Sequence, residues 1–513
     1  MHPGGPFSIP AINNYIPEKL KPWIIILFVI VFQFASGGVY LATLNKVVGD
    51  QALMQEDILM AGYATLIGTA LTFTIMLRLK MRFLSKHVFL ICCAALIICN
   101  IICLYTSNVF VLIAVCFFAG IFRMWATFEC NSTIQLWLTP TRDFSVFFCF
   151  IYLLVQGSIL LSGSTHLYIE LLTTWQHVHW VIMGALLGVT LIVLVIFNSK
   201  RMMPAFPLFG IDWLGMFMWG LIMLNINFIA LYGKHYDWWQ SSEIQIGTVF
   251  LMILLVLNIY RASFIRHPFI SLKTFQIKIV YMTFLAYLIV DFFISPAHLI
   301  EEIYMHEILH YETSNLIEMN WVGFIGIALG AAFTYFYFAK AKNSYKSTFL
   351  IGFSSLVMYL LLMYFNLDYN TSQTTLGISV LFRNFGYVVI AIVLLTSLTK
   401  VPFPNFFQAI SVQAIVSAAC GSAVLGAVLK EIFSTTMSKN FQLLSMPLDR
   451  LNLQLMNVSS SGLGKALHHQ AMMVSFKEIY GLMILLAILS IFIFIFYQNP
   501  LLKAISFSFK NKI

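Results

Sequence analysis

The sequence contains very few charged residues. Only 10% of its 513 residues are Asp, Glu, Lys or Arg, while 60% are hydrophobic. Soluble domains usually carry about 25% charged residues. The chain therefore lacks the polar surface of a soluble protein, and no stretch between its apolar runs is long enough for a separate soluble domain.

Cysteine is also scarce, and its spacing forms no framework. All eight cysteines fall within apolar runs, where cysteine behaves as a small apolar residue. Their positions match neither a disulfide scaffold nor a zinc-binding pattern. The sequence accordingly predicts no cofactor.

Long apolar runs recur from one end of the chain to the other. A helix needs about 20 apolar residues to cross a hydrocarbon layer roughly 30 Å thick. The first run has no obvious signal-peptide cleavage site, so we expect it to remain as a span. The pattern predicts an all-α polytopic membrane protein. The fourteen expected spans are residues 22–44, 57–77, 88–105, 109–137, 144–163, 178–197, 209–232, 246–260, 279–299, 319–339, 348–365, 375–399, 406–428 and 476–498.

The basic residues are distributed unequally between the two sides of these spans. The formal net charge is +9, and most lysines and arginines outside the spans fall on one side if the chain starts there. Positive residues are enriched in cytoplasmic loops. Both termini are therefore expected in the cytoplasm, and the positive charge needs no nucleic-acid partner to explain it.

Several short motifs are more specific. Residues 212–215 (DWLG) open one span, 237–239 (DWW) close its outer loop, and 267–275 (HPFISLKTF) follow the next span. Two further motifs of this kind lie at 304–317 and at 470–480. Together they resemble the fourteen-span drug:proton antiporters of the major facilitator superfamily, the group that includes EmrB and QacA.

The resemblance implies a fold and a function. It implies a six-span half at 1–200, two inserted central spans at 201–278, and a second six-span half at 279–513 with an outer loop at about 429–475. Such proteins work by rocking the halves about a site at the bilayer midplane. The implied function is proton-coupled efflux of a small amphipathic molecule across a bacterial cytoplasmic (inner) membrane, with a periplasmic adaptor and an outer-membrane channel as further partners.

The sequence also departs from the family pattern. The family's arginine in span 4 is Cys116, and the usual acid of span 1 falls near Gly37 or Gly38. The loop motif after span 2 lacks its acid and both glycines at 77–84. These departures favour an alternative, an importer or facilitator of a small anionic or zwitterionic solute.

Two arginines lie within predicted spans. A charge there costs about 2.5 to 3.5 kcal/mol on insertion scales, so it usually faces a partner or a watery cavity. Arg123 and Arg383 occupy corresponding fourth helices of the two halves if these repeat. Both are candidates for binding an anionic group of the substrate. The alternative is that each bonds a carbonyl or an acid and locks helices together.

Two acids within spans are candidates for proton coupling. Asp291 shares a helix face with Thr283, Tyr287 and Ser295, because these residues are spaced by four. This stripe is expected to face the cavity, with Tyr287 as a further substrate contact. The alternative for Asp291 is a permanent ion pair with Arg383. Glu129 is the second candidate, with a place at the cytoplasmic rim as its alternative.

One motif suggests a different class of protein. His306-Glu307-Ile308-Leu309-His310 fits the HExxH pattern, in which two histidines one helical turn apart bind zinc and the glutamate acts as a base. An intramembrane zinc metalloprotease is therefore a rival hypothesis. No third ligand is spaced to support it, and the segment coincides with the transporter-like stretch at 304–317.

Overall fold

The computed structural model describes the whole chain except residues 1–11, 14, 36, 200–206, 447–459 and 497–513. The described part confirms the all-α prediction. Thirteen of its helical segments are long and apolar enough to cross a membrane, and the shorter apolar helix α1 (Lys21–Phe34) lies at the first expected span. Each of the fourteen expected spans therefore contains an apolar helix.

The helices follow one another with short connections. After α1 come α2 (Leu44–Gln51), α3 (Gln55–Arg82), α4 (Ser85–Tyr105), α5 (Val109–Leu138), α6 (Phe144–Leu172) and α7 (Trp175–Ile196). The central pair is α8 (Trp213–Tyr232) and α9 (Ser242–Phe264). After it come α10 (Leu272–Gln276), α11 (Lys278–Ile294), α12 (Ile300–Ile303), α13 (Thr313–Phe333), α14 (Tyr345–Asn366), α15 (Gln373–Leu398), α16 (Phe403–Ala414), α17 (Ser422–Ser445) and α18 (Ser460–Phe496). Short π-helical segments, 304–308, 334–340 and 415–421, continue α12, α13 and α16.

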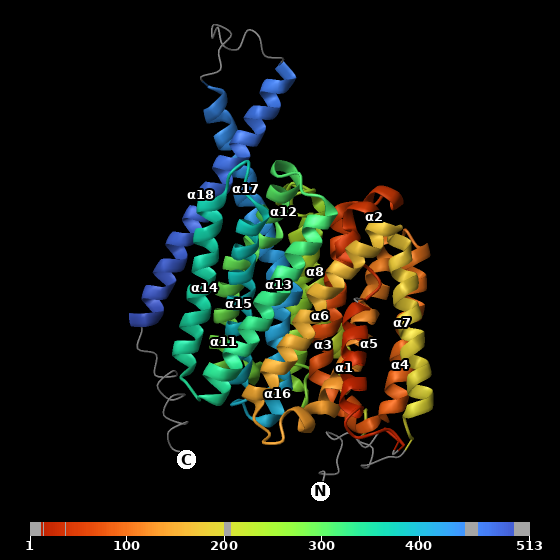
Figure 1. The fold of residues 1–513 in the computed structure, drawn as a ribbon. Coiled ribbons are helices and arrows are strands. Elements are labelled where there is room, and N and C mark those ends of the chain that lie inside the picture. Colours follow the sequence, from red (N-terminus) through yellow and green to blue (C-terminus); the bar gives the residue numbers. More distant parts are fainter. Residues whose placement is uncertain (1–11, 14, 36, 200–206, 447–459, 497–513) are drawn as a thin grey trace.

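The helices form one bundle. In Figure 1, α1, α3, α4, α5 and α7 lie on one side and α14, α15 and α18 on the other, with α6, α8 and α13 between them. Across the middle, α6 packs against α13 and α15, and α3 packs against α16. The helices α17 and α18 extend beyond the upper end of the bundle.

Two ion pairs join helices from the early and late parts of the chain. Lys342, after the π-helical end of the α13 span, pairs with Asp143, which caps α6. In the second pair, Lys430 of α17 lies 3.3 Å from Glu56 of α3. Both pairs are partly exposed, so each is expected to contribute little more than about 1 kcal/mol.

The first span is not the continuous helix 22–44 that the sequence predicts. Helix α1 ends at Phe34, and Gly37 and Gly38 follow with φ values of 125° and 103°. Residues other than glycine rarely adopt such values. A Cβ atom on Gly37 would also lie 2.5 Å from Cγ2 of Thr65. The apolar run therefore contains a break, which hydropathy alone does not reveal.

The 212–215 motif has a structural role at the start of α8. Asp212 accepts hydrogen bonds from Gly215 N at 2.9 Å and Phe269 N at 3.0 Å. Its carboxylate also accepts hydrogen bonds from both terminal guanidinium nitrogens of Arg261 on α9, at 2.8 and 2.5 Å. A Cβ at position 215 would lie 2.2 Å from Asp212 Oδ2, so any other residue there would displace this carboxylate. One carboxylate thus ties α8, α9 and the following loop together.

Replacing Asp212 by asparagine is expected to lower the stability of the fold and to make that stability less sensitive to acidic pH. Burial acts to raise the pKa of Asp212, but the hydrogen bonds from Arg261, Gly215 and Phe269 outweigh it, and the pKa lies below its ordinary value. The stability contributed by the ionised carboxyl is complete above the pKa of an unfolded aspartate, about 3.9. It is lost as the pH falls through the lower folded value.

Thermal unfolding of the purified protein at a series of pH values measures this effect. The Asp212→Asn variant should unfold at a lower temperature at pH 7 and lose less stability than the unsubstituted protein below about pH 4. Asp237→Asn, in the loop at the other end of α8, is the matched control and should follow the unsubstituted protein. Identical acid profiles for Asp212→Asn and the control would contradict the role assigned to this carboxylate.

Candidate functional site

Asp291 is on α11, near side chains of α6 and α15. Its Oδ2 atom is buried and has no hydrogen-bond partner among the described residues. The side chains of Tyr152 on α6 and Tyr387 on α15 lie in its electrostatic surroundings. Tyr152 also lies beside Gln413 of α16, whose Oε1 atom is buried without a hydrogen-bond partner in the described structure. One oxygen of the Asp291 carboxyl and the amide oxygen of Gln413 thus both lack a hydrogen-bond partner within the described residues, and both lie near Tyr152.

The rest of the predicted stripe on α11 packs against neighbouring helices. Tyr287 is 1% exposed, and its hydroxyl lies 3.1 Å from the carbonyl oxygen of Ala391 on α15 and beside Tyr152. The hydroxyls of Thr283 and Ser295 donate to carbonyls of their own chain segment at 2.9 and 2.7 Å. Among the four residues of the stripe, Asp291 alone has a buried side-chain oxygen without a partner in the part of the chain that the structure describes.

Arg383 pairs with Glu301 and not with Asp291. The guanidinium of Arg383 on α15 donates to Glu301 on α12, and the side chains of Arg383 and Glu301 are 18% and 5% exposed. The second oxygen of Glu301 accepts the hydroxyl of Tyr359 at 2.5 Å, and Arg383 lies over the Tyr359 ring. The alternative of an Asp291–Arg383 ion pair is therefore wrong, because Glu301 provides the partner acid.

Arg123 is held by an uncharged side chain. Its Nη2 atom donates to Gln33 Oε1 at 2.7 Å, and Gln33 Nε2 donates to Thr127 Oγ1 at 2.9 Å. Gln33 is on α1, while Arg123 and Thr127 lie one turn apart on α5. Gln33 is buried and Arg123 is half-buried. This hydrogen bond to an uncharged side chain fixes the direction of the guanidinium.

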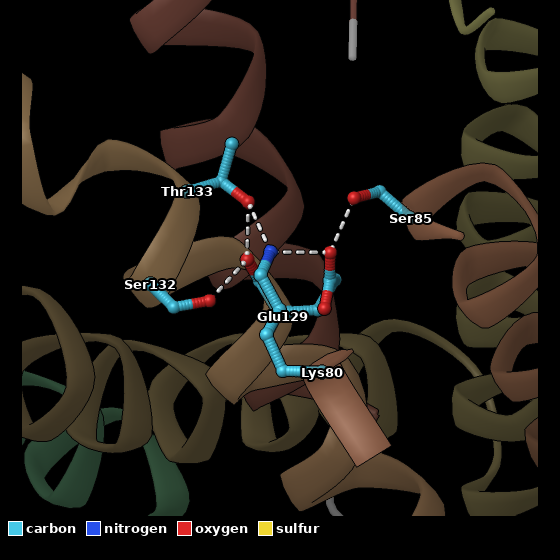
Figure 2. A network of polar contacts seen from close by, with 5 residues as sticks. All are labelled: Lys80, Ser85, Glu129, Ser132 and Thr133. Atoms are coloured by element: carbon cyan, nitrogen blue, oxygen red, sulfur yellow. Dashed lines mark hydrogen bonds and ion pairs between the residues drawn. The ribbon is translucent and has the colours of Figure 1, made fainter. Parts of the chain in front are cut away.

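Glu129 belongs to a buried ion pair near the end of α3 and the start of α4 (Figure 2). Lys80 of α3 lies 2.6 Å from its Oε1 atom, and the two side chains are 4% and 1% exposed. Lys80 also donates to Thr133 at 3.1 Å, and Ser85 donates to the same Glu129 oxygen. A carboxylate bound in this way links α3, α4 and α5, which is a structural role for this proton-site candidate.

A further polar cluster joins Tyr40 to residues of α4, α6 and α7. The hydroxyl of Tyr40 donates to Asn100 Oδ1 at 2.6 Å, and His179 Nδ1 lies 3.1 Å from the same oxygen. The ring of His166 lies 4.5 Å from that of Tyr40, and its Nε2 atom has no hydrogen-bond partner in the described structure. His166 and His179 are both buried, with exposed fractions of only 2% and 3%.

The HExxH segment does not have the geometry that its motif requires. It begins in a π-helical turn, Tyr304–Ile308, and His310 lies beyond the end of this turn with φ at 51°. The two histidines therefore do not face one way from a single α-helical turn. Within the described residues there is no group of three or more His, Cys, Asp or Glu side chains placed to bind a metal.

Comparisons with solved structures identify the fold. The chain is similar to a structure of a proton-dependent oligopeptide transporter, with a TM-score of 0.59, 9% identity, and coverage of 94% of this chain and 99% of that one. It is also similar to a mutant of the peptide transporter POT (TM-score 0.57, 13% identity, 92% and 93% covered). A third similar structure is the human organic anion transporter MFSD10 (TM-score 0.52, 10% identity, 93% and 100% covered).

These similarities confirm the major facilitator fold, because they extend over almost the whole chain and almost the whole of each structure. No protein-family model and no curated protein matches the sequence. At such low identity a likeness shows the fold alone. The narrower resemblance to drug:proton antiporters remains a prediction.

Proposed function

We propose that this protein is a proton-coupled secondary transporter of a small amphipathic solute and that Asp291 carries the proton. The observation that supports this most directly is the buried Asp291 oxygen without a partner in the described structure, between α6 on one side and α11 and α15 on the other. An unpaired charge in such a place costs several kcal/mol, and binding of a proton removes the charge. A carboxyl at the contact between two halves can therefore link protonation to their movement.

The proposed solute has an apolar body and an anionic group. Tyr152 and Tyr387, which are half-buried, offer aromatic surfaces near Asp291, and Arg123 offers a guanidinium that Gln33 orients. Guanidinium pairs well with carboxylate and phosphate. We assign Arg123 to direct contact with the solute. We assign Arg383 a role in positioning α15 against α12, because its guanidinium already pairs with Glu301.

The resemblance at the two inserted spans supports export, as in drug:proton antiporters. The second candidate is import or facilitated entry of an anionic or zwitterionic solute. Arg123 supports this second candidate, since lipophilic cations would need an exposed acid in its place. The similar peptide and organic anion transporters agree with an anionic or zwitterionic solute. We further propose that both termini face the cytoplasm of a bacterium and that α17 and α18 extend into the periplasm, where an adaptor would bind.

Reconstituted vesicles test the function and its direction together. Purified protein in liposomes is given a panel of labelled compounds that contains a dipeptide, an aromatic organic anion and a lipophilic cation. We expect the anion or the dipeptide to accumulate when a proton gradient is imposed, and an uncoupler to abolish accumulation. The orientation of the gradient that drives accumulation separates export from import. Absence of gradient-dependent movement for all three classes, with folded protein in the vesicles, would contradict the proposal.

A further inference from the structure

An apolar cleft lies among the later helices, and neither Asp291 nor Arg123 is among its lining residues. It has a volume of about 370 Å³ and lies between α11, α14, α15 and α18. Its walls are mostly aliphatic and aromatic, with Met282, Ala286 and Phe353 among the lining residues. This volume lies within the range of small-molecule sites, about 300 to 1,000 Å³.

The serine and threonine hydroxyls in the cleft offer no strong site for a polar ligand. Thr283, Ser397 and Ser490 each donate to a carbonyl of their own helix, at 2.9, 2.6 and 2.8 Å. Their hydrogen-bonding protons are therefore already used. The surface that remains is suited to an apolar chain.

The position of the cleft matches one leaflet of a bilayer. The lining residues of α11 run from Ile279 to Ile289, a rise of about 15 Å at 1.5 Å per residue. This is about half of a hydrocarbon layer roughly 30 Å thick. Residues on its rim are exposed on the outside of the bundle, with Ile289 44% and Ile493 59% exposed. The cleft therefore opens where lipid chains surround the protein.

Lysine side chains gather at one end of the cleft. Tyr345 and Ser397 line that end, and Lys400 follows Ser397 by three residues and lies 4.4 Å from the centre of the Tyr345 ring. Lys346 follows Tyr345, and its ammonium donates to the carbonyl of Ile495 at 3.2 Å. Lys278 begins α11, directly before the lining residue Ile279, and is exposed.

The acid in the surroundings of Tyr345 already has a lysine partner. Asp143 lies in the electrostatic surroundings of Tyr345, and it is paired with Lys342. Burial lowers the pKa of Lys400 to about 8. A nearby anion favours the charged form of such a lysine.

We propose that this cleft binds an acyl chain of an anionic phospholipid whose phosphate lies against Lys400, Lys346 and Lys278. The apolar walls, the height of one leaflet and the cluster of lysines at the end where a headgroup would lie all fit one occupant. Each basic residue near a membrane surface strengthens the attraction of anionic lipid severalfold. The lipid site is separate from the proposed transport site, so either proposal can fail without the other.

Native mass spectrometry of the purified full-length protein tests the site. Phosphatidylglycerol and phosphatidylcholine with identical acyl chains are titrated separately, and the first bound lipid is quantified. We expect phosphatidylglycerol to bind about fivefold more tightly than phosphatidylcholine. Lys400→Gln should remove most of this preference. The matched control is Lys340→Gln, because Lys340 also lies over an aromatic ring, but this ring, that of Phe336, does not line the cleft, whereas Tyr345 does.

A second set of variants tests the apolar part. Ala286→Trp and Leu350→Trp fill the cleft from opposite walls and should weaken binding of both lipids, and elution as a monodisperse peak shows which of them is folded. Equal affinity for the two lipids in the unsubstituted protein would overturn the proposal. So would unchanged lipid binding in Lys400→Gln and in both folded tryptophan variants. Tighter binding of free oleate than of phosphatidylglycerol would also overturn it, since the occupant would then be a fatty acid.

Discussion

Replacement of Asp291 by asparagine is expected to abolish gradient-driven transport while leaving solute exchange intact. Asparagine keeps the volume of the side chain but cannot bind and release a proton. Accumulation driven by a proton gradient should fall to about a tenth or less, because a costly intramembrane acid usually has such a function. Exchange of labelled for unlabelled solute needs no net proton movement and should stay within about twofold, since binding contacts elsewhere are unchanged.

The measurement compares driven accumulation with exchange in the same vesicles at two pH values. Asp368→Asn is the control, since Asp368 is an exposed acid in the loop after α14. It should behave as the unsubstituted protein in both assays. If Asp291→Asn retains driven accumulation and its pH dependence, Asp291 is not the proton carrier. If both assays fail while the protein is folded, its role is in solute binding and not in coupling.

The sequence predicts the spans well because each depends on a local property. A run of about 20 apolar residues has no stable alternative to a helix in lipid, since every backbone polar group has to be satisfied internally. The run 22–44 is the exception. It contains Gly37 and Gly38, whose φ values are positive, so apolar composition continues where the helix does not.

The ends of the spans are less predictable, and this hides the partners of the charged residues. Hydropathy ends the second span at 77 and the ninth at 299, where charged residues begin. The chain instead continues in helical turns beyond these points, and it buries Lys80 against Glu129 and Glu301 against Arg383. Candidate charges can thus be identified from their insertion cost, but their partners depend on helix packing that the sequence does not display.

Uncharged polar residues within apolar runs are a weaker sequence signal for the partners of buried charges. Gln33 stands in an otherwise apolar run, and the structure places it against Arg123. The cluster of Tyr40, Asn100 and His179 carries the same signal at Asn100, which stands in the apolar run 88–105, but its members come from three distant segments. Partners of buried charges are therefore best sought among polar residues in apolar runs as well as among opposite charges.

Removal of one partner from the Arg383–Glu301 pair is expected to destabilise the protein strongly. Both side chains are largely buried, and Glu301 also accepts the Tyr359 hydroxyl. Breaking a buried ion pair on one side costs about 3–5 kcal/mol, because the remaining charge is left without a partner. Arg383→Met and Glu301→Gln should therefore each lower the temperature of unfolding. In the Glu301→Gln variant the new amide oxygen can still accept the tyrosine hydroxyl, so the effect isolates the lost charge.

The double variant decides between a structural and a substrate-binding role for Arg383. With both charges removed, no unpaired charge remains, and the double variant should be more stable than either single variant, with a coupling of about 0.5–3 kcal/mol. Lys430→Gln, which removes the exposed pair with Glu56, is the control and should cost about 1 kcal/mol or less. If Arg383→Met unfolds at the temperature of the unsubstituted protein yet loses solute binding, the guanidinium contacts the solute. Recovery of both stability and transport in the double variant would instead show that Arg383 acts by holding α12 against α15.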